Sequence, residues 1–224
     1  MSASVASVSP RFSVRGVQLS RAALAAIAAL MITFSPDHSA AVGLAVFSGF
    51  GIATGLVLAI AAWLTYPAGR RWGAVLLAAA AIVAGMIAGV PALRSTVMFF
   101  AVVISWALVS GLIELLWGLR DRRRGPRAEA RDAMTLGVIG LLLGIALLFV
   151  RADYALDYAI EDGGRTMEFT LTGITIAVGV YGAYAAIVAV YLAIAAFSPR
   201  PAVVAPASVT DSVSGTDSVA EERV

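Results

Sequence analysis

One acidic residue, Glu114, lies inside a long apolar stretch, residues 105–119, and a cluster of arginines follows it from Arg120. A charge inside a bilayer costs a few kcal/mol on insertion scales, so an intramembrane carboxylate is a functional hypothesis by default. By the helical rise, Glu114 lies about 9 Å from the headgroups on the Arg120 side. At this depth, Glu114 can bind and release protons, or it can hold a basic side chain of another helix.

These two interpretations of Glu114 make different demands on the rest of the chain. A structural ion pair needs a basic residue at a similar depth, and Arg21 meets this condition because it lies 15 residues before Pro36. Arg71 is the second candidate. A proton pathway needs further titratable groups, and a single carboxylate makes no relay. We therefore prefer the structural pair and keep the proton-binding role as the alternative.

Three more acidic residues, Asp153, Asp157 and Glu161, recur at every fourth position of a polar segment, residues 151–170. On a helix, this spacing places them on one face, and Gly163-Gly164 would end such a helix. We predict an interfacial helix with aromatic anchors and a solvated acidic face. The alternative is a weak divalent-cation site or a pH-sensitive element, although carboxylates along one helix diverge instead of converging on an ion.

The other polar residues indicate no catalytic chemistry. The chain has no cysteine, and it contains no phosphate-binding glycine loop, metal-ligand cluster or Ser/His/Asp set. We expect no enzymatic activity, cofactor or metal. The lone histidine, His38, is interpreted as a turn residue, with acid sensing as the alternative.

Composition indicates a membrane protein. The chain is 60% hydrophobic and 13% charged, whereas soluble domains are about 45–50% apolar and about 25% charged. A helix needs about 20 residues to cross a bilayer. The apolar residues form six blocks, at residues 22–34, 41–64, 72–90, 96–119, 134–150 and 171–197. We predict an all-α polytopic protein with six transmembrane helices, whose main partner is the lipid bilayer.

The first apolar block has two interpretations. It is long enough to span the membrane only if the helix starts near Val14. Alternatively, it is the core of a signal peptide, with arginines before it and a cleavage site at Ser39-Ala40. His38 and Asp37 make that cleavage site a poor one, so we prefer a retained helix.

Arginines set the expected orientation. All 16 basic residues are arginine, and thirteen of them fall on the same side of the six spans as the N-terminus. The positive-inside rule therefore places both termini in the cytoplasm. The use of arginine alone, with abundant Ala and Val, indicates GC-rich coding and a bacterial inner membrane. The basic segment 120–133 is interpreted as a topology signal, with contact to anionic headgroups as a further role. Nucleic-acid binding is not expected, since this cluster lies against the membrane.

Sequence similarity between the blocks indicates internal repeats. Residues 54–57 (TGLV) resemble 110–113 (SGLI), and residues 184–187 (YAAI) resemble 106–109 (WALV). We predict three repeated helical hairpins at residues 14–64, 65–119 and 134–197, with a basic cytoplasmic loop at 120–133 and a long acidic outer loop at 151–170. The ends, residues 1–13 and 198–224, are predicted to be disordered and cytoplasmic.

Small residues four positions apart mark the expected helix contacts, because they let two backbones approach closely. We predict packing inside one chain and keep a homo-oligomer interface as the alternative. The predicted contact residues are Gly51, Gly55, Ala107, Gly111, Gly179 and Ala183.

The motif WALVSGLIEL at residues 106–115, followed by basic residues, resembles the HdeD-like family of small bacterial membrane proteins. The likeness extends over residues 15–197. It implies six spans in three hairpins and a link to acid stress, without an established catalytic residue or ligand. The third hairpin departs from the pattern, since Ala189 replaces Gly111 and Leu192 replaces Glu114 at the equivalent positions.

Two functions are therefore expected. The first is a non-enzymatic inner-membrane protein of the HdeD-like type that contributes to acid or envelope-stress tolerance. The second is a small transporter or channel subunit with Glu114 lining the pathway, for a substrate that the sequence does not identify. In a conducting role, Glu114 should face a water-filled cavity.

Overall fold

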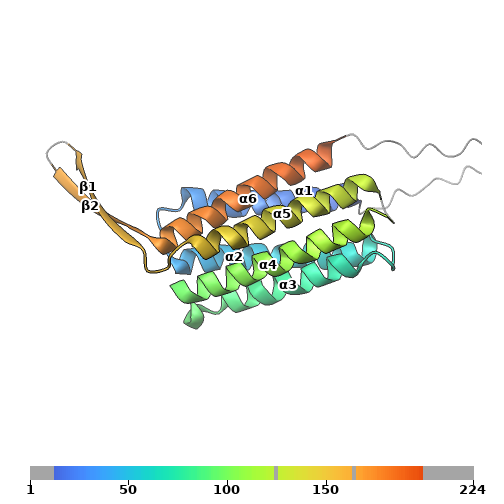
Figure 1. Cartoon of the computed structure of the whole chain (residues 1–224), viewed down its shortest axis with the longest axis horizontal. Coiled ribbons are helices and arrows are strands. Elements are labelled where there is room, and N and C mark those ends of the chain that lie inside the picture. Colours follow the sequence, from blue (N-terminus) through green and yellow to red (C-terminus); the bar gives the residue numbers. More distant parts are fainter. Residues whose placement is uncertain (1–12, 124–125, 163–164, 199–224) are drawn as a thin grey trace, which may run out of the picture.

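The computed structural model describes residues 13–123, 126–162 and 165–198 and shows a bundle of six long helices (Figure 1). All six are long and apolar enough to cross a membrane. They are α1 (Val14–Phe34), α2 (Ala40–Leu64), α3 (Trp72–Gly89), α4 (Thr96–Asp121), α5 (Arg127–Phe149) and α6 (Gly173–Phe197). The prediction of an all-α polytopic membrane protein is confirmed. The segments predicted to be disordered lie outside the described residues, apart from Ser13 and Ser198.

Hydroxyl side chains fix the starts of four of the helices. Each accepts a hydrogen bond from a backbone N–H three residues later, which satisfies a group that the first helical turn leaves unpaired. The capping residues are Ser13, Ser39, Ser95 and Thr172. With Ser13 as its cap, α1 begins at Val14 and has 21 residues, enough to cross the hydrocarbon layer.

The connection between α4 and α5 is shorter than predicted. α4 continues to Asp121 and α5 begins at Arg127, so most of the predicted basic loop, residues 120–133, is helical. Pro126 precedes the first turn of α5, a position where proline is tolerated because the first N–H groups of a helix have no intrahelical partner. The helical start of α5 turns Glu129 and Asp132 toward the bundle, where both accept hydrogen bonds.

The six helices form a closed ring, in which each helix contacts its neighbours in the chain and α6 returns to α1. The most extensive contacts join α2 with α3, α4 with α5, and α6 with α1. Contacts within each predicted hairpin, such as α1 with α2, are smaller. The largest interfaces therefore join one predicted hairpin to the next, and the interface between the two helices of a hairpin is smaller.

Glycines allow the helices at these large interfaces to approach each other closely. A Cβ on Gly51 would lie 2.9 Å from the backbone oxygen of Ala81, and one on Gly55 would lie 3.0 Å from that of Ala78. On α4, a Cβ on Gly111 would lie 2.8 Å from the backbone nitrogen of Leu141. No side chain fits at such distances, so α2 packs on α3, and α4 on α5, backbone to backbone.

On α6 the predicted contact residues do not pack. Gly179 and Ala183 are exposed, and a Cβ on Gly179 would meet nothing within 4 Å. Gly182 makes the close contact instead, because a Cβ there would lie 2.6 Å from Ile32 of α1. The prediction that these two residues pack inside one chain is wrong, since a membrane helix is apolar all round and its composition does not mark the packed face. Ala107 on α4, by contrast, is fully buried.

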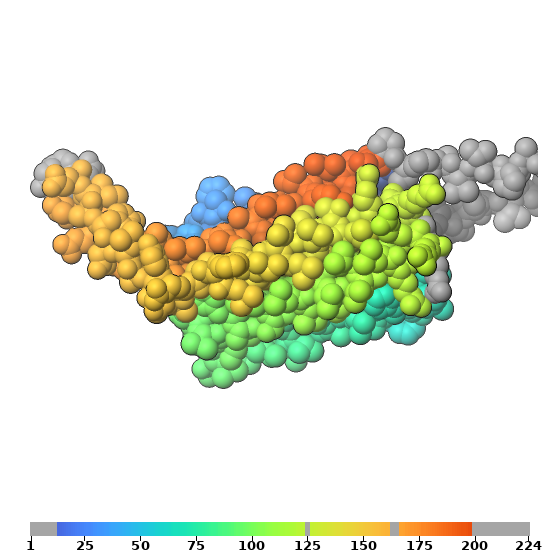
Figure 2. Space-filling model, in the orientation of Figure 1, coloured from blue at the N-terminus to red at the C-terminus, as the bar shows by residue number. Residues whose placement is uncertain are grey.

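The outer segment predicted as an interfacial helix is a β-hairpin. Strand β1 (Ala155–Asp162) pairs antiparallel with β2 (Arg165–Thr172). Figure 1 shows this hairpin beyond the end of the bundle that lies opposite the start of α1, and Figure 2 shows it as an arm that stands clear of the helices. The helix prediction is wrong because a spacing of four is also a multiple of two, so Asp157 and Glu161 share a strand face as well. Gly163-Gly164 lies outside the described residues.

Alternation along the hairpin gives it one apolar and one polar face. The polar face carries Asp157, Glu161 and Glu168 together with threonines. The apolar face carries Leu156, Tyr158, Ile160, Met167 and Phe169, each between 43% and 50% exposed.

Candidate functional site

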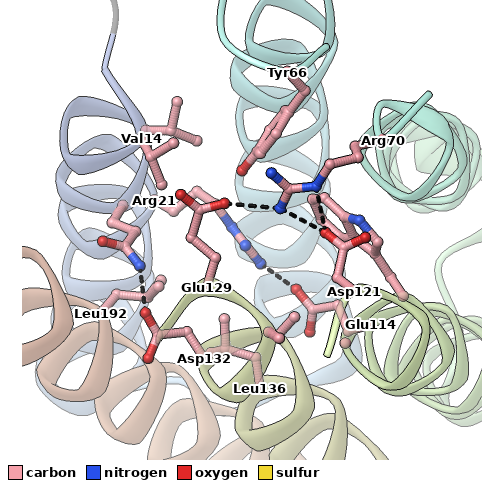
Figure 3. A pocket seen from close by; sticks show the side chains of 16 residues that line it. Val14, Arg21, Tyr66, Arg70, Glu114, Asp121, Glu129, Asp132, Leu136 and Leu192 are labelled. Carbon is pink, nitrogen blue, oxygen red and sulfur yellow. Dashed lines mark hydrogen bonds and ion pairs between the residues drawn. The ribbon is translucent and has the colours of Figure 1, made fainter. Parts of the chain in front are cut away.

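Arg21 of α1 and Glu114 of α4 meet inside the bundle, as Figure 3 shows. Arg21 Nη2 donates a hydrogen bond to Glu114 Oε1 at 2.7 Å, and the two side chains are only 17% and 8% exposed. Arg71, the second candidate partner, lies elsewhere, with its guanidinium 5.0 Å from the centroid of the Trp63 ring. The structure therefore places Glu114 beside Arg21 and not beside Arg71.

A second charged group lies between Glu114 and the end of the bundle where α1 begins. Arg70, in the loop between α2 and α3, donates to Asp121 at 2.6 Å and to Glu129 at 3.0 Å (Figure 3). Burial by itself lowers the pKa of Arg70, but its hydrogen bonds to Asp121 and Glu129 raise the pKa above its ordinary value. The guanidinium thus stays charged and joins the α2–α3 loop to both α4 and α5.

Asp132 of α5 makes a third polar connection. It accepts hydrogen bonds from Gln18 Nε2 at 2.9 Å and from the Tyr191 hydroxyl at 3.1 Å. Because Gln18 lies on α1 and Tyr191 on α6, this carboxylate joins three helices near the end of the bundle.

The site also contains three acidic residues that the sequence pattern did not indicate, because they fall in the segment 120–133 predicted as a loop. They are Asp121, Glu129 and Asp132. Their spacing carried a usable signal. Asp121 follows Glu114 by seven residues, which places both on one helical face, and Glu129 and Asp132 are three residues apart.

These side chains line a cavity, here called the inner cavity. Its volume is about 40 Å³, counted as the space open to the centre of a water molecule. Arg70 and Glu129 are each 19% exposed, so the polar cluster reaches the surface at this end of the bundle. Burial raises the pKa of Tyr66, another lining residue, to about 12, so its hydroxyl remains protonated at neutral pH. The charged lining residues are Glu114, Asp121, Glu129 and Asp132, with Arg21 and Arg70.

A second space, here called the central cavity, lies on the other side of the Arg21–Glu114 pair. Its volume on the same measure is about 20 Å³, and both members of the pair line both cavities. The predicted repeats meet here, because α2, α4 and α6 contribute positions that the repeat alignment makes equivalent, in successive layers. The layers are Phe50, Trp106 and Tyr184; then Thr54, Ser110 and Val188; then Leu58, Glu114 and Leu192.

Some polar atoms in the central cavity lack partners. Thr54 Oγ1 and Trp106 Nε1 are buried and have no hydrogen-bond partner in the described part of the chain. Ser110 Oγ donates to the carbonyl oxygen of Ala107 at 3.5 Å, the upper limit for a hydrogen bond. The middle of the bundle is therefore polar but incompletely satisfied.

On the hairpin side of the central cavity the core is tightly packed and apolar, apart from the buried Tyr181 hydroxyl, which has no hydrogen-bond partner among the described residues. Phe47, Phe99, Val103 and Tyr181 are fully buried there. The Phe47 ring lies edge-on to Trp106, with centroids 5.1 Å apart, and to Tyr181, with centroids 5.7 Å apart. The bundle is thus polar toward the start of α1 and closed toward the hairpin.

The acidic residues of the hairpin do not gather into a site. Asp153 pairs with Arg151 at 2.8 Å, and Asp157 accepts a hydrogen bond from Thr170 at 2.6 Å. Both hydrogen bonds are exposed to solvent, and Glu161 is also exposed. Among the residues that the structure describes, no group of three or more His, Cys, Asp or Glu is placed to hold a metal ion.

Comparison with known proteins returns no relative: no family model, curated protein or solved structure matches this chain. The site itself is therefore the basis for assigning a function. It combines a buried ion pair, a polar cavity on each side of the pair, and a closed core beyond.

Proposed function

We propose that the protein is a small, non-enzymatic membrane transport protein in which the Arg21–Glu114 pair forms a gate. The observation that carries the proposal is that both residues line the inner cavity and also the central cavity. A buried ion pair that only fixed two helices would need no polar space on either side. The pair instead occupies the boundary between a cluster of charges that reaches the surface and a polar space in the middle of the bundle.

The charges at this boundary suit a gate. With the pair closed, the guanidinium and carboxylate neutralise each other and block the way between the cavities. A solute or proton that neutralises or replaces one partner would release the other. The closed core around Phe47 and Tyr181 separates the pair from the hairpin end of the bundle. In this conformation the pair is therefore reached from one end only, as alternating access requires.

We also propose that the α1-start end faces the cytoplasm of a bacterial inner membrane. The excess of arginines at that end supports this orientation. Because the chain has no cysteine, single cysteines can test it. Arg123→Cys should react with a membrane-impermeant thiol reagent only after the cells are opened, whereas His38→Cys should react in spheroplasts. The opposite pattern would overturn the orientation.

Flux through reconstituted liposomes tests the transport proposal. We expect purified wild-type protein to carry protons or a small cation down an imposed gradient. Glu114→Gln can neither take up a proton nor re-form the ion pair in each transport cycle, so it should abolish this flux while the protein stays folded. The matched control is Ser105→Ala on the exposed face of α4, which should keep the wild-type flux. Flux that is unchanged in Glu114→Gln would contradict the proposal.

A second candidate function is the acid- or envelope-stress role of an HdeD-like protein. The resemblance of WALVSGLIEL to that family favours it, and so does the closed core, which suits a protein that reinforces the membrane without conducting. Survival after an acid shock tests this function in a host strain that lacks the gene, complemented with wild type or with Glu114→Gln at matched levels. If the deletion leaves survival unchanged, the stress role fails.

A further inference from the structure

The central cavity contains polar side chains that the rest of the described chain does not satisfy. Thr54 is 5% exposed and Trp106 is 7% exposed, and both line the cavity. Thr54 Oγ1 and Trp106 Nε1 have no partner among the described residues. A buried polar group without a hydrogen-bond partner destabilises the folded protein. A polar molecule that hydrogen-bonds both groups would remove this cost.

Size restricts what that molecule can be. The cavity has about 20 Å³ open to the centre of a water molecule, and a bound water needs about 10–15 Å³ on this measure. The cavity can therefore hold one water molecule, and two at most. A hydrated cation or an organic solute is too large for the cavity in this conformation.

The chemistry of the lining also fits water. Trp106 Nε1 can only donate a hydrogen bond, the Thr54 and Ser110 hydroxyls can donate or accept, and the Glu114 carboxylate accepts. Water donates two hydrogen bonds and accepts two, so it can serve all of these groups together. A bare metal cation finds no net negative charge here, because the Glu114 carboxylate is already paired with the Arg21 guanidinium, which lines the same cavity.

We propose that the central cavity binds water, and that this water relays protons between Glu114 and the hydroxyls of Thr54 and Ser110. This inference rests on the proposed transport function and identifies the proton as its solute. The position of the cavity supports it, because Glu114 lies between this water and the inner cavity that reaches the surface.

The relay is a balanced proton transfer. A proton from the inner cavity forms an O–H bond on Glu114 and neutralises the carboxylate, so Arg21 loses its charged partner. That O–H bond then breaks as the cavity water accepts the proton, and the water passes one of its own protons to the next hydroxyl oxygen. That hydroxyl in turn releases its own proton to solvent when the bundle opens toward the hairpin, as alternating access requires. Each oxygen ends with as many bonds as it began with, and no oxidant or reductant takes part.

Charged or titratable groups surround Glu114 on several sides, whereas α2 and α3 themselves contribute only apolar residues and Thr54. The charged or titratable groups on other elements are Arg21 on α1, Tyr66 and Arg70 in the α2–α3 loop, Glu129 and Asp132 on α5, and Tyr184 on α6; Asp121 lies on the same helix. Only Arg21 is within ion-pair distance of Glu114 in the described chain. The pH dependence of flux should therefore shift when Arg21 is replaced by Gln.

Infrared spectroscopy tests for the water directly. Difference spectra of the wild-type protein recorded in H₂¹⁶O and H₂¹⁸O should contain an isotope-sensitive O–H band from a bound water. The conservative change Thr54→Val removes the hydroxyl and keeps the shape, so the band should be lost or shifted. The control Ser105→Ala should keep the band. A wild-type spectrum without such a band, or a band that Thr54→Val leaves unchanged, would overturn the inference.

Proton flux in liposomes tests the relay, with thermal unfolding of each variant as a check on folding. We expect folded Thr54→Val and Trp106→Phe to lose proton flux, whereas Ser105→Ala keeps it. If both cavity variants carry protons at the wild-type rate while Glu114→Gln does not, the relay is wrong and the gate stands. If the wild type carries a metal cation but no protons, the relay is again wrong and transport stands. If Glu114→Gln itself transports normally, the proposed function fails.

Discussion

Glu114 of α4 and Leu192 of α6 line the same central cavity from equivalent positions of two predicted repeats, and Leu58 of α2 occupies the third position. One charge thus replaces an otherwise apolar layer, and Arg21 of α1 compensates it at 2.7 Å. Carboxylates at all three of these positions would repel one another strongly in a medium of low dielectric constant. A single carboxylate with a single guanidinium makes a neutral pair that either a proton or a competing charge can open.

Loss of either partner in the Arg21–Glu114 pair should destabilise the protein. Glu114→Gln leaves the guanidinium without its counter-charge, and removal of one member of a buried pair costs about 3 kcal/mol. Arg21→Gln should cost a similar amount. The double variant should regain part of the loss, since no uncompensated charge remains. Thermal unfolding in detergent measures these effects, with Arg122→Gln on the exposed end of the bundle as the control. Strictly additive losses in the double variant would show that the two side chains do not interact.

Substitution of Gly51 should weaken the bundle, whereas substitution of Gly179 should not. In Gly51→Ala, the new Cβ meets the backbone oxygen of Ala81 at 2.9 Å, and backbone cannot move aside as a flexible side chain can. Overpacking of this kind costs about 1–3 kcal/mol. Gly179→Ala places its methyl group in open space, and alanine favours the helix over glycine. Unfolding temperatures of the two variants should separate clearly; equal temperatures would contradict the described α2–α3 interface.

Paired cysteines can test the β-hairpin, because the natural chain has none. Ala159 and Glu168 are directly opposite in the antiparallel register. Opposite Cα atoms lie about 4.5–5.5 Å apart, within the range of a disulfide. Ala159→Cys with Glu168→Cys should cross-link rapidly under mild oxidation. In the control, Ala155→Cys with Thr166→Cys, the pair is six positions out of register and should stay reduced. Equal cross-linking of both pairs would argue against the strands.

Acid should break the Arg151–Asp153 ion pair, at the base of the hairpin, only well below neutral pH. The hydrogen bond from Arg151 lowers the pKa of Asp153 below its ordinary value of 3.8. Because the pKa is lowered in the folded state, the pair contributes its full stability at pH values above the ordinary pKa. This contribution is lost as the pH falls through the lower pKa of the folded state. An NMR titration of the Asp153 carboxyl should show a low midpoint that returns toward 3.8 in Arg151→Ala. The same midpoint in both proteins would contradict the pair.

The features that could be predicted from the sequence are those that a pattern along the chain defines without knowledge of the packing. Six apolar blocks separated by polar residues define six spans, whatever the packing is. The position of Arg21 relative to Pro36 placed it at the depth of Glu114, which made it the preferred partner, and the structure pairs the two residues.

Features that depend on which face of a helix is packed could not be predicted in this way. Gly179 and Gly182 are both small residues in an apolar helix, and only the presence of Ile32 on α1 decides which of them is buried. In the outer segment the alternation of period two was visible from Leu156 to Glu161, but the spacing of the acidic residues fits a helix equally well. Pairing between the two strands, which is not local, decided the outcome.

The most direct test of the central claim is to measure flux and stability on the same preparations of wild type and Glu114→Gln. A gate predicts that folded Glu114→Gln, checked by its unfolding transition, carries no proton or cation flux above that of protein-free liposomes. If Glu114→Gln unfolds at a lower temperature but carries the wild-type flux below that temperature, then Arg21 and Glu114 hold two helices together and do not form a gate.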